Sequence, residues 1–260
     1  MGFPAEVKAS VGISPSIKAG TKFGHAPSGM QVTRTTIWDR ADATPTQQVM
    51  VLPTEARIHN IASTDNVNDK AGGTGALTVR VYGLTSWDQR THETSELVTL
   101  NGTTAVATTN SYVIVHRMRI ESCGSTGWNT GTLTATAVTD ATVSQQVRIG
   151  MGSSQSCFLG VPRGWRSMVY QWYVQVDKSS GSAQSAAFSI EDWEMSDPAN
   201  PVINIRDQQG VQSTGVSSHT RDYKFPLRFT GPCVVHVSAV ASAADLDGDS
   251  SFTHMLCGGI

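Results

Sequence analysis

The chain has 260 residues, a formal net charge of −2 and only 15% charged residues. This balance gives no basic surface of the kind that binds nucleic acid or an anionic membrane. No apolar run approaches the roughly 20 residues of a membrane span, and the N-terminus lacks the apolar core of a signal peptide. We therefore expect no direct contact with nucleic acid or membrane, and a protein that stays in the cytoplasm where it is made.

The first 30 residues combine proline and glycine with isolated apolar side chains. Prolines such as Pro4 and Pro15 argue against a helix, and spaced residues such as Val7 and Val11 argue against a purely solvated tail. We expect an extended arm over residues 1–30 that can lie across a neighbouring subunit. A disordered terminus is the alternative, because disorder concentrates at chain ends.

From residue 31 onward, apolar and polar side chains alternate in short runs separated by glycine and polar turns. This period of two is typical of β-strands with one packed face. In residues 168–176, for example, Met168, Tyr170, Trp172 and Val174 share one face, and this strand should be central. The predicted strands are 32–38, 57–62, 76–84, 111–120, 132–136, 143–149, 157–161, 168–176, 188–194, 202–205, 225–229 and 234–240.

No stretch is long and periodic enough to predict a helix. The pattern indicates an all-β fold of β-sandwich or jelly-roll type, in one or two units behind the N-terminal arm. We divide the chain into a first β-rich unit over 31–162 and a second over 163–260, with one continuous β domain as the alternative. The polar stretch 206–223 should be an exposed excursion and is a candidate contact surface.

The four cysteines are far apart and form no C-x-x-C pair. Zinc sites usually show closely spaced ligand pairs, and disulfides need an oxidising compartment. We therefore predict free thiols at Cys123, Cys157, Cys233 and Cys257.

Two segments near the C-terminus superficially resemble functional sites. Asp245, Asp247 and Asp249 alternate as in a calcium loop, but the glycine and the bidentate Glu of an EF-hand are out of place, so we expect a surface turn. Gly248-Asp249-Ser250 resembles the nucleophile region of chymotrypsin-like proteases. However, Ser251 and Phe252 stand where those enzymes need glycines for the oxyanion hole.

Other polar residues also favour structural roles. His116 and His236 alternate with apolar residues, so we expect packed histidines satisfied by the backbone. Asn101-Gly102-Thr103 matches a glycosylation sequon but first indicates a tight hairpin turn. The carboxylates of residues 191, 192 and 194 sit near a strand end, and a glycosidase would need two of them facing across a cleft. No catalytic, cofactor-binding or metal-binding residue is predicted, and we do not expect an enzyme.

Several segments carry a family resemblance: VYGLTSW, LVTLNGTTAVATTNSYVIVHRMRI, GWNTGTLTATA, GVQSTGVSSH and KFPLRFTGPCVVHVSAVASAADLDGDSSF. Together they resemble a group of uncharacterised virion structural proteins of tailed bacteriophages, especially aquatic ones. The resemblance covers patches from Thr33 to the C-terminus. It implies an all-β protein built into the particle, without catalytic residues to carry over.

We therefore expect a virion protein assembled in the host cytoplasm, most simply a head decoration or auxiliary protein that docks on the capsid shell. Its partners would be the major capsid protein or tail proteins, together with further copies of itself, reached through loops, strand edges and the arm. A tail-associated or fibre-base protein is the second hypothesis. The third is a glycan-binding or glycan-cleaving β-sandwich, in which exposed Trp87, Trp128 or Trp165 would stack on sugar rings.

Overall fold

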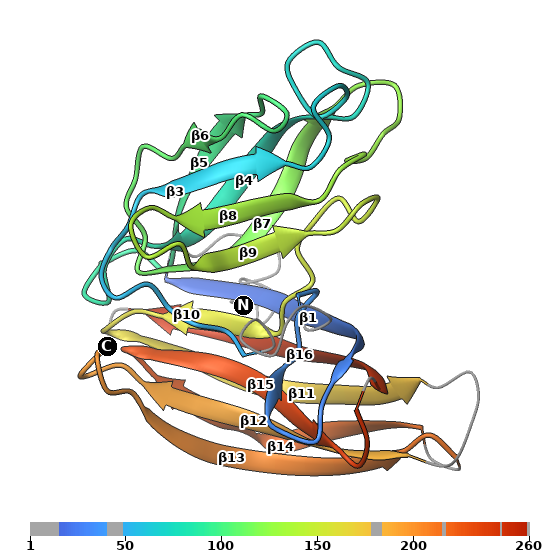
Figure 1. Ribbon diagram of the computed structural model, residues 1–260. Coiled ribbons are helices and arrows are strands. Elements are labelled where there is room, and N and C mark those ends of the chain that lie inside the picture. Colours follow the sequence, from blue (N-terminus) through green and yellow to red (C-terminus); the bar gives the residue numbers. More distant parts are fainter. Residues whose placement is uncertain (1–15, 41–48, 178–183, 215–216, 245, 259–260) are drawn as a thin grey trace, which may run out of the picture. The chain divides into compact units, whose positions relative to one another are not determined.

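The computed structural model describes residues 16–40, 49–177, 184–214, 217–244 and 246–258, and every regular element in these ranges is a β-strand (Figure 1). The predicted all-β fold is thus confirmed. In these ranges no helix is long and apolar enough to cross a membrane. The chain forms two compact units: unit 1 is Met1–Val49 with Cys157–Ile260, and unit 2 is Met50–Ser156.

Unit 1 is built on two antiparallel sheets. The first has the order β1-β16-β11-β14, with bounds Ile17–Met30, Leu246–Gly258, Trp165–Asp177 and Ser218–Thr230. The second has the order β10-β15-β12-β13, with bounds Phe158–Val161, Cys233–Ala241, Ser185–Glu194 and Val202–Gln212. The short β2 (Thr35–Thr36) pairs with β15 beyond the end of β10.

The two sheets of unit 1 enclose one apolar core. Trp172, Phe252 and Phe229 from the first sheet and Phe188 from the second are fully buried. Gly248 marks the closest approach, because a Cβ there would lie 2.4 Å from the Met30 side chain and 3.2 Å from the Phe188 ring. A glycine at this position therefore lets the sheets pack at full density.

Residues 17–30 belong to this body. β1 pairs with β16 from Ile17 opposite Cys257 to Met30 opposite Leu246. The prediction of a separate arm is therefore wrong for residues 17–30, while residues 1–15 lie outside the described residues. The apolar residues of the segment are spaced to pack in a sheet, but its partner strand lies at the far end of the chain, where sequence pattern does not reveal pairing.

Unit 2 also consists of two sheets. One has the order β6-β3-β8-β9, with bounds Val106–Ala107, His59–Ser63, Leu133–Ala137 and Val143–Val147. The other has the order β5-β4-β7, with bounds Thr94–Thr99, Ala76–Leu84 and Ile114–Cys123. Ile61 and Leu133 from the first sheet share a buried cluster with Val79, Val81 and Met118 from the second.

The division into units differs from the sequential one predicted over 31–162 and 163–260. Unit 1 is discontinuous, because β1 and β2 pair with strands from the C-terminal part of the chain. The strand predicted at 157–161 therefore opens the second part of unit 1 instead of closing the first unit.

Two further strand predictions need correction. In β11 the buried face is Trp165 and Val169, then Trp172 and Val174, because a bulge shifts the register between Val169 and Gln171. Met168 and Tyr170 are consequently not on the buried face. The stretch 206–223 is mostly exposed, as predicted, but it is not an excursion from the sheets, because its described ends continue β13 and β14 as edge strands.

Candidate functional site

A group of hydrogen-bonded polar side chains in unit 1 surrounds Glu191 on β12. We name it the Glu191 cluster; its members are Arg34, Thr36, Glu191, Trp193, His236 and Ser238. Glu191 accepts hydrogen bonds from Trp193 Nε1 (2.9 Å), His236 Nδ1 (2.9 Å) and Ser238 Oγ, and it pairs with the Arg34 guanidinium. Arg34 also lies over the Trp193 ring, 5.5 Å from its centroid.

The cluster reproduces the connectivity of a catalytic triad. Thr36 Oγ1 lies 2.9 Å from His236 Nε2, and His236 Nδ1 lies 2.9 Å from Glu191 Oε2, which gives the order hydroxyl, imidazole, carboxylate. Thr36 and His236 are fully buried, however, and Glu191 is almost so. A substrate has no path to this hydroxyl in the structure, so the geometry supports a structural role.

The charges of the cluster follow from its burial. Burial lowers the pKa of His236, against the opposing effect of Glu191. Burial also acts to raise the pKa of Glu191, but the hydrogen bonds from His236, Ser238 and Trp193 outweigh it and bring that pKa to about 2. An ionised Glu191 beside a neutral His236 leaves Arg34 as the compensating charge, and the cluster fastens residues 34–36 to β12 and β15.

Ser250 lies inside the core, with no access for a substrate. Its Oγ accepts a hydrogen bond from Trp172 Nε1 (2.9 Å) and donates one to the Tyr173 carbonyl (2.9 Å). Its neighbour Asp249 contacts His25 Nδ1 at 2.7 Å across the β1–β16 ladder. Ser250 and Asp249 therefore have different partners, and they are not arranged as a nucleophile with the histidine and carboxylate that would activate it.

The aspartates of the calcium-like segment are divided by the structure. Asp247 and Asp249 lie on β16, so the surface turn predicted there is wrong for residues 246–249, and Asp245 lies outside the described residues. Among the described side chains, no group of three or more His, Cys, Asp or Glu residues could hold a metal ion.

The two histidines predicted to be packed are buried. Each has a side-chain partner that the prediction did not include: His236 contacts Thr36 and Glu191, and His116 Nε2 lies 3.3 Å from Glu93 Oε2. Glu191 itself was predicted only as a carboxylate near a strand end. Its alternation with Trp193 on a buried strand was the available signal, but nothing in the sequence pointed to Arg34.

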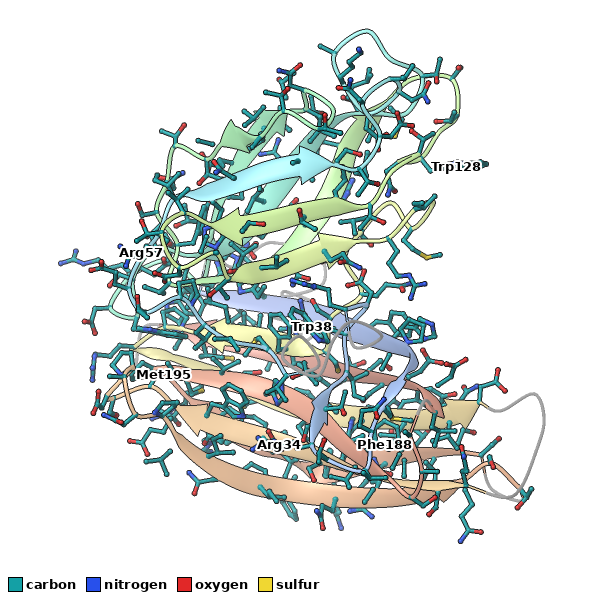
Figure 2. All side chains as sticks on the ribbon, in the orientation of Figure 1. Arg34, Trp38, Arg57, Trp128, Phe188 and Met195 are labelled. Carbon is teal, nitrogen blue, oxygen red and sulfur yellow. The ribbon has the colours of Figure 1, made fainter. Side chains whose placement is uncertain are left out.

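The structure also shows where the predicted turn, the cysteines and the tryptophans lie. The turn at Asn101-Gly102 exists, with Gly102 at a φ of +62°, but it joins strands of two different sheets and is not a tight hairpin. All four cysteines are free thiols, as predicted. Trp87 and Trp165 are buried, whereas Trp128 is 54% exposed and projects from a loop of unit 2 (Figure 2).

Among the described residues, β13 and β14 of unit 1 each pair with a neighbour on one side only. β13 ends the second sheet and β14 ends the first. Val202 and Ile205 on β13 are 56% and 58% exposed, and Phe225 on β14 is 81% exposed. We name this surface the β13–β14 edge, and define it by Val202–Gln212 and Ser218–Thr230.

A pocket of about 510 Å³ opens at this edge. Arg206 and Arg228 line it together with Asp192 and Glu194. Arg206 donates to Asp192 (3.3 Å), and burial raises the pKa of Asp192 while Arg206 opposes that shift. The carboxylates thus already balance part of the positive charge of this pocket.

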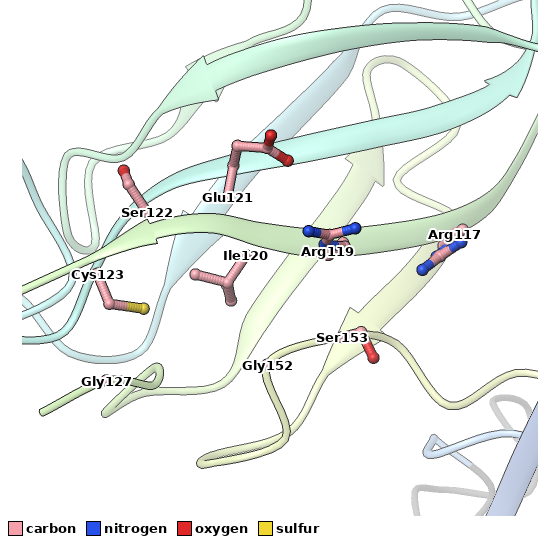
Figure 3. A pocket seen from close by; sticks show the side chains of 9 residues that line it. All are labelled: Arg117, Arg119, Ile120, Glu121, Ser122, Cys123, Gly127, Gly152 and Ser153. Atoms are coloured by element: carbon pink, nitrogen blue, oxygen red, sulfur yellow. The ribbon is translucent and has the colours of Figure 1, made fainter.

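A second pocket, of about 450 Å³, lies beside β7 in unit 2 (Figure 3). We name it the β7 groove; Arg117, Arg119, Ile120, Glu121, Ser122, Cys123, Gly127, Gly152 and Ser153 line it. In Figure 3 the side chains of Ile120 and Cys123 point toward the loops that carry Gly127 and Gly152, and Glu121 and Ser122 point to the other side of the strand.

Comparison with known proteins adds little. No family model and no curated protein matches the chain. Two solved structures are similar over 98% of this chain at 8% identity and a TM-score of 0.24: the structure of infectious bursal disease virus Gt strain, of which 77% is covered, and the crystal structure of the infectious bursal disease virus VP2 subviral particle, of which 78% is covered. A TM-score of 0.24 is far below that of two chains with a common fold.

Proposed function

We propose that the chain is a structural protein of a bacteriophage particle, and that it docks on the capsid shell as a head decoration or auxiliary protein. The observation that carries this proposal is the β13–β14 edge, where apolar side chains lie on strands with a free edge. An exposed apolar strand edge is a hazard for a protein that remains alone, and it is buried when the protein takes its place in an assembly.

The shape of the edge indicates how such docking would work. The register of β13 shifts at Arg206, between the partners of Ile190 and Glu191. β14 leaves its partner β11 between Asp222 and Leu227, in a segment that contains Phe225 and Pro226. Bulges and an edge proline prevent the continuous addition of a further strand. Contact would therefore be made by side chains, with Phe225 as the most exposed anchor.

The family resemblance of the sequence supports the same setting. The segments that resemble virion proteins of tailed bacteriophages include GVQSTGVSSH, which spans the end of β13 and the start of β14. The Glu191 cluster and Ser250, the two arrangements that resemble hydrolase chemistry, are both enclosed. The most accessible features of unit 1 are thus suited to adhesion.

The test is incorporation into particles. A tagged chain would be produced in host cells during phage growth, and the particles purified on a density gradient. We expect the tagged chain to band with intact particles, and a Phe225→Ser variant to be incorporated at least about tenfold less, as expected for the loss of an anchor of 2 kcal/mol or more. Phe23→Ser is the matched control, because Phe23 is also exposed on an edge strand of the same sheet.

Absence of the tagged chain from the particles, or equal incorporation of both variants, would contradict the proposed docking role. Separation of heads from tails before the measurement distinguishes a capsid position from the tail-associated alternative.

A further inference from the structure

We propose that the β7 groove of unit 2 binds the charged end of an acidic sugar, a saccharide that carries a carboxylate or a phosphate group. The groove belongs to unit 2 alone, and the inference does not depend on the docking surface of unit 1.

The first argument is electrostatic. No ion pair or side-chain hydrogen bond within the described chain engages the Arg119 guanidinium. Arg117 lies over the Tyr82 ring, 5.4 Å from its centroid, which leaves its N–H groups for a ligand. The carboxylate among the lining residues, Glu121, is held by Arg80 Nε at 3.3 Å, and Arg80 is the cross-strand partner of Arg119. One carboxylate thus faces the three arginines at positions 80, 117 and 119, and a net positive charge remains for a ligand.

A guanidinium that has no protein partner favours an oxyanion. Its planar fork of N–H donors matches a carboxylate or a phosphate and can bind either through two parallel hydrogen bonds. Two such groups at positions 117 and 119 lie on the same side of one strand, because alternate residues of a strand face the same way. This pair is too small for the extended phosphate contacts of nucleic acid, and the chain has a net charge of −2.

The second argument is that the groove is rigid. Asn129 is fully buried, and its Nδ2 donates to the carbonyls of Arg148 (2.7 Å) and Gly131 (2.8 Å). Its Oδ1 accepts from Gly152 N (3.2 Å), while the Gly152 carbonyl accepts from Ile120 N (2.7 Å). These bonds fasten the two loops to each other and to β7, so the walls are formed before a ligand arrives.

The third argument is space. Gly127 and Gly152 adopt φ values of +78° and +67°, which L side chains rarely adopt, and a Cβ at either position would meet no atom within 4 Å. The glycines therefore satisfy a backbone requirement and leave the groove open. Its volume of about 450 Å³ falls in the usual range for small-molecule sites, about 300–1,000 Å³.

The residue after Gly127 distinguishes a sugar from a simple anion. Trp128 is 54% exposed, although it belongs to the loop that Asn129 holds in place. An indole combines a flat apolar face with one N–H donor, and this suits the mixed apolar and hydroxyl surface of a sugar ring. Ser153 adds a hydroxyl in the lining. Trp128 is not itself a lining residue, but it follows Gly127, which is one. A sugar whose carboxylate or phosphate meets Arg119 would therefore contact Trp128 only by extending along the groove past Gly127.

The experiment uses the full-length chain and titration calorimetry with defined probes. N-acetylneuraminic acid and glucuronic acid carry a carboxylate, and glucose 1-phosphate carries a phosphate. Glucose, acetate and inorganic phosphate are the controls that lack either the charge or the ring. We expect saturable binding of at least one acidic sugar and weaker or no binding of the three controls.

Variants then locate the site. Arg119→Ala should weaken binding about tenfold or more, because it removes a charge-assisted contact, and Arg119→Lys should recover part of the affinity. Trp128→Ala should weaken the binding of the acidic sugars but leave any residual binding of acetate or phosphate unchanged. Arg228→Ala is the matched control, since it removes an exposed arginine from unit 1.

Each outcome decides the proposal. Binding that depends on Arg119 and Trp128 but not on Arg228 supports it. No saturable binding of any acidic sugar overturns it, and so does equal loss in the Arg119 and Arg228 variants. Acetate or phosphate that binds as tightly as the sugars would show an anion site without a role for the ring, which also overturns it. Thermal unfolding of each variant confirms that the compared proteins are folded.

Discussion

Glu191 and His236 are joined by a hydrogen bond of 2.9 Å between Oε2 and Nδ1, on neighbouring strands of unit 1 where both side chains are shielded from solvent. Because Arg34 shares the same carboxylate, Glu191 connects the segment before β2 to the second sheet. The group is a buried ionic network, in which loss of one charge leaves the others uncompensated.

We therefore predict that Glu191→Gln lowers the free energy of unfolding by about 3–5 kcal/mol, the usual cost of breaking a buried charged pair. The free energy of unfolding is measured by urea titration, with tryptophan fluorescence as the signal. Glu194→Gln on the same strand is the control and should change stability by less than about 0.5 kcal/mol, because Glu194 is exposed. Equal effects of the two substitutions would contradict the role given to the cluster.

Ser250→Ala should destabilise unit 1 by about 1–3 kcal/mol, because the buried Trp172 indole N–H loses its acceptor. Any esterase or protease turnover found in the preparation should be unchanged by the substitution. Ser251→Ala, on the partly exposed face of the same strand, is the control. Turnover that disappears in a stably folded Ser250→Ala protein would show the nucleophile that the structure does not support.

The strands that could be predicted from sequence are those whose side chains alternate regularly. Residues 76–84 were predicted as a strand and form β4 with the same bounds, because its inward positions at Val79 and Val81 are apolar. β16 was missed, since Asp247 and Asp249 alternate there with Gly248 and Ser250, and such a polar run is typical of a turn. Its inward residues are small because Met30 and Trp172 fill the space.

The β7 groove could not be predicted from the sequence, for a different reason. Trp128 could be named as an exposed aromatic residue, because glycine and polar residues surround it. The link between its loop and Gly152 depends on the buried amide of Asn129, a contact between segments that are distant in sequence. Alternation along one strand carries no information about such a contact. The free guanidinium of Arg119 likewise becomes visible only when its neighbours are known.

The four thiols should separate into two classes. Cys157 and Cys233 are buried, and burial raises the pKa of Cys157 to about 12 and that of Cys233 well above its ordinary value. Cys123 and Cys257 are partly exposed. A thiol reagent at pH 8 should therefore modify two groups in the native protein and four after denaturation without reductant. Fewer than four in the denatured protein would reveal a disulfide and contradict the structure.

His59 in unit 2 should make stability depend on pH. Its Nδ1 contacts the Arg57 carbonyl (2.9 Å) and its Nε2 contacts Ser144 Oγ (2.8 Å). Burial lowers its pKa to about 4, against about 6.5 in the unfolded chain. The unfolded chain thus binds more protons between these values, so the contribution of His59 is complete above pH 6.5 and is lost as the pH falls toward 4.

The loss from this group should amount to about 3 kcal/mol between pH 7 and pH 4. A His59→Gln protein should therefore show a smaller decrease in unfolding free energy over that interval, whatever its stability at pH 7. His92→Gln replaces a partly exposed histidine of the same unit and should keep the wild-type slope. An unchanged slope in His59→Gln would mean that the pKa of His59 is not lowered in the folded protein.

The N-terminal segment provides the sharpest test of the architecture. An independent arm over residues 1–30 could be removed without affecting the body. In the structure, residues 17–30 pair with β16, and the Gly24 backbone approaches Ile37 and Cys157 so closely that a Cβ would lie 2.2 Å from the Ile37 carbonyl oxygen. Deletion of residues 1–30 would uncover one edge of β16 and part of the core below Met30.

A typical domain is stable by only about 5–15 kcal/mol, so the loss of a whole strand should unfold unit 1 at room temperature. Calorimetry of the deletion protein should show one transition, from unit 2, in place of two. Deletion of residues 1–15 is the control, since the described contacts of β1 begin after it, and it should keep both transitions near their wild-type temperatures. A protein that lacks residues 1–30 and still unfolds like the full chain would show that β1 is not part of the folded body.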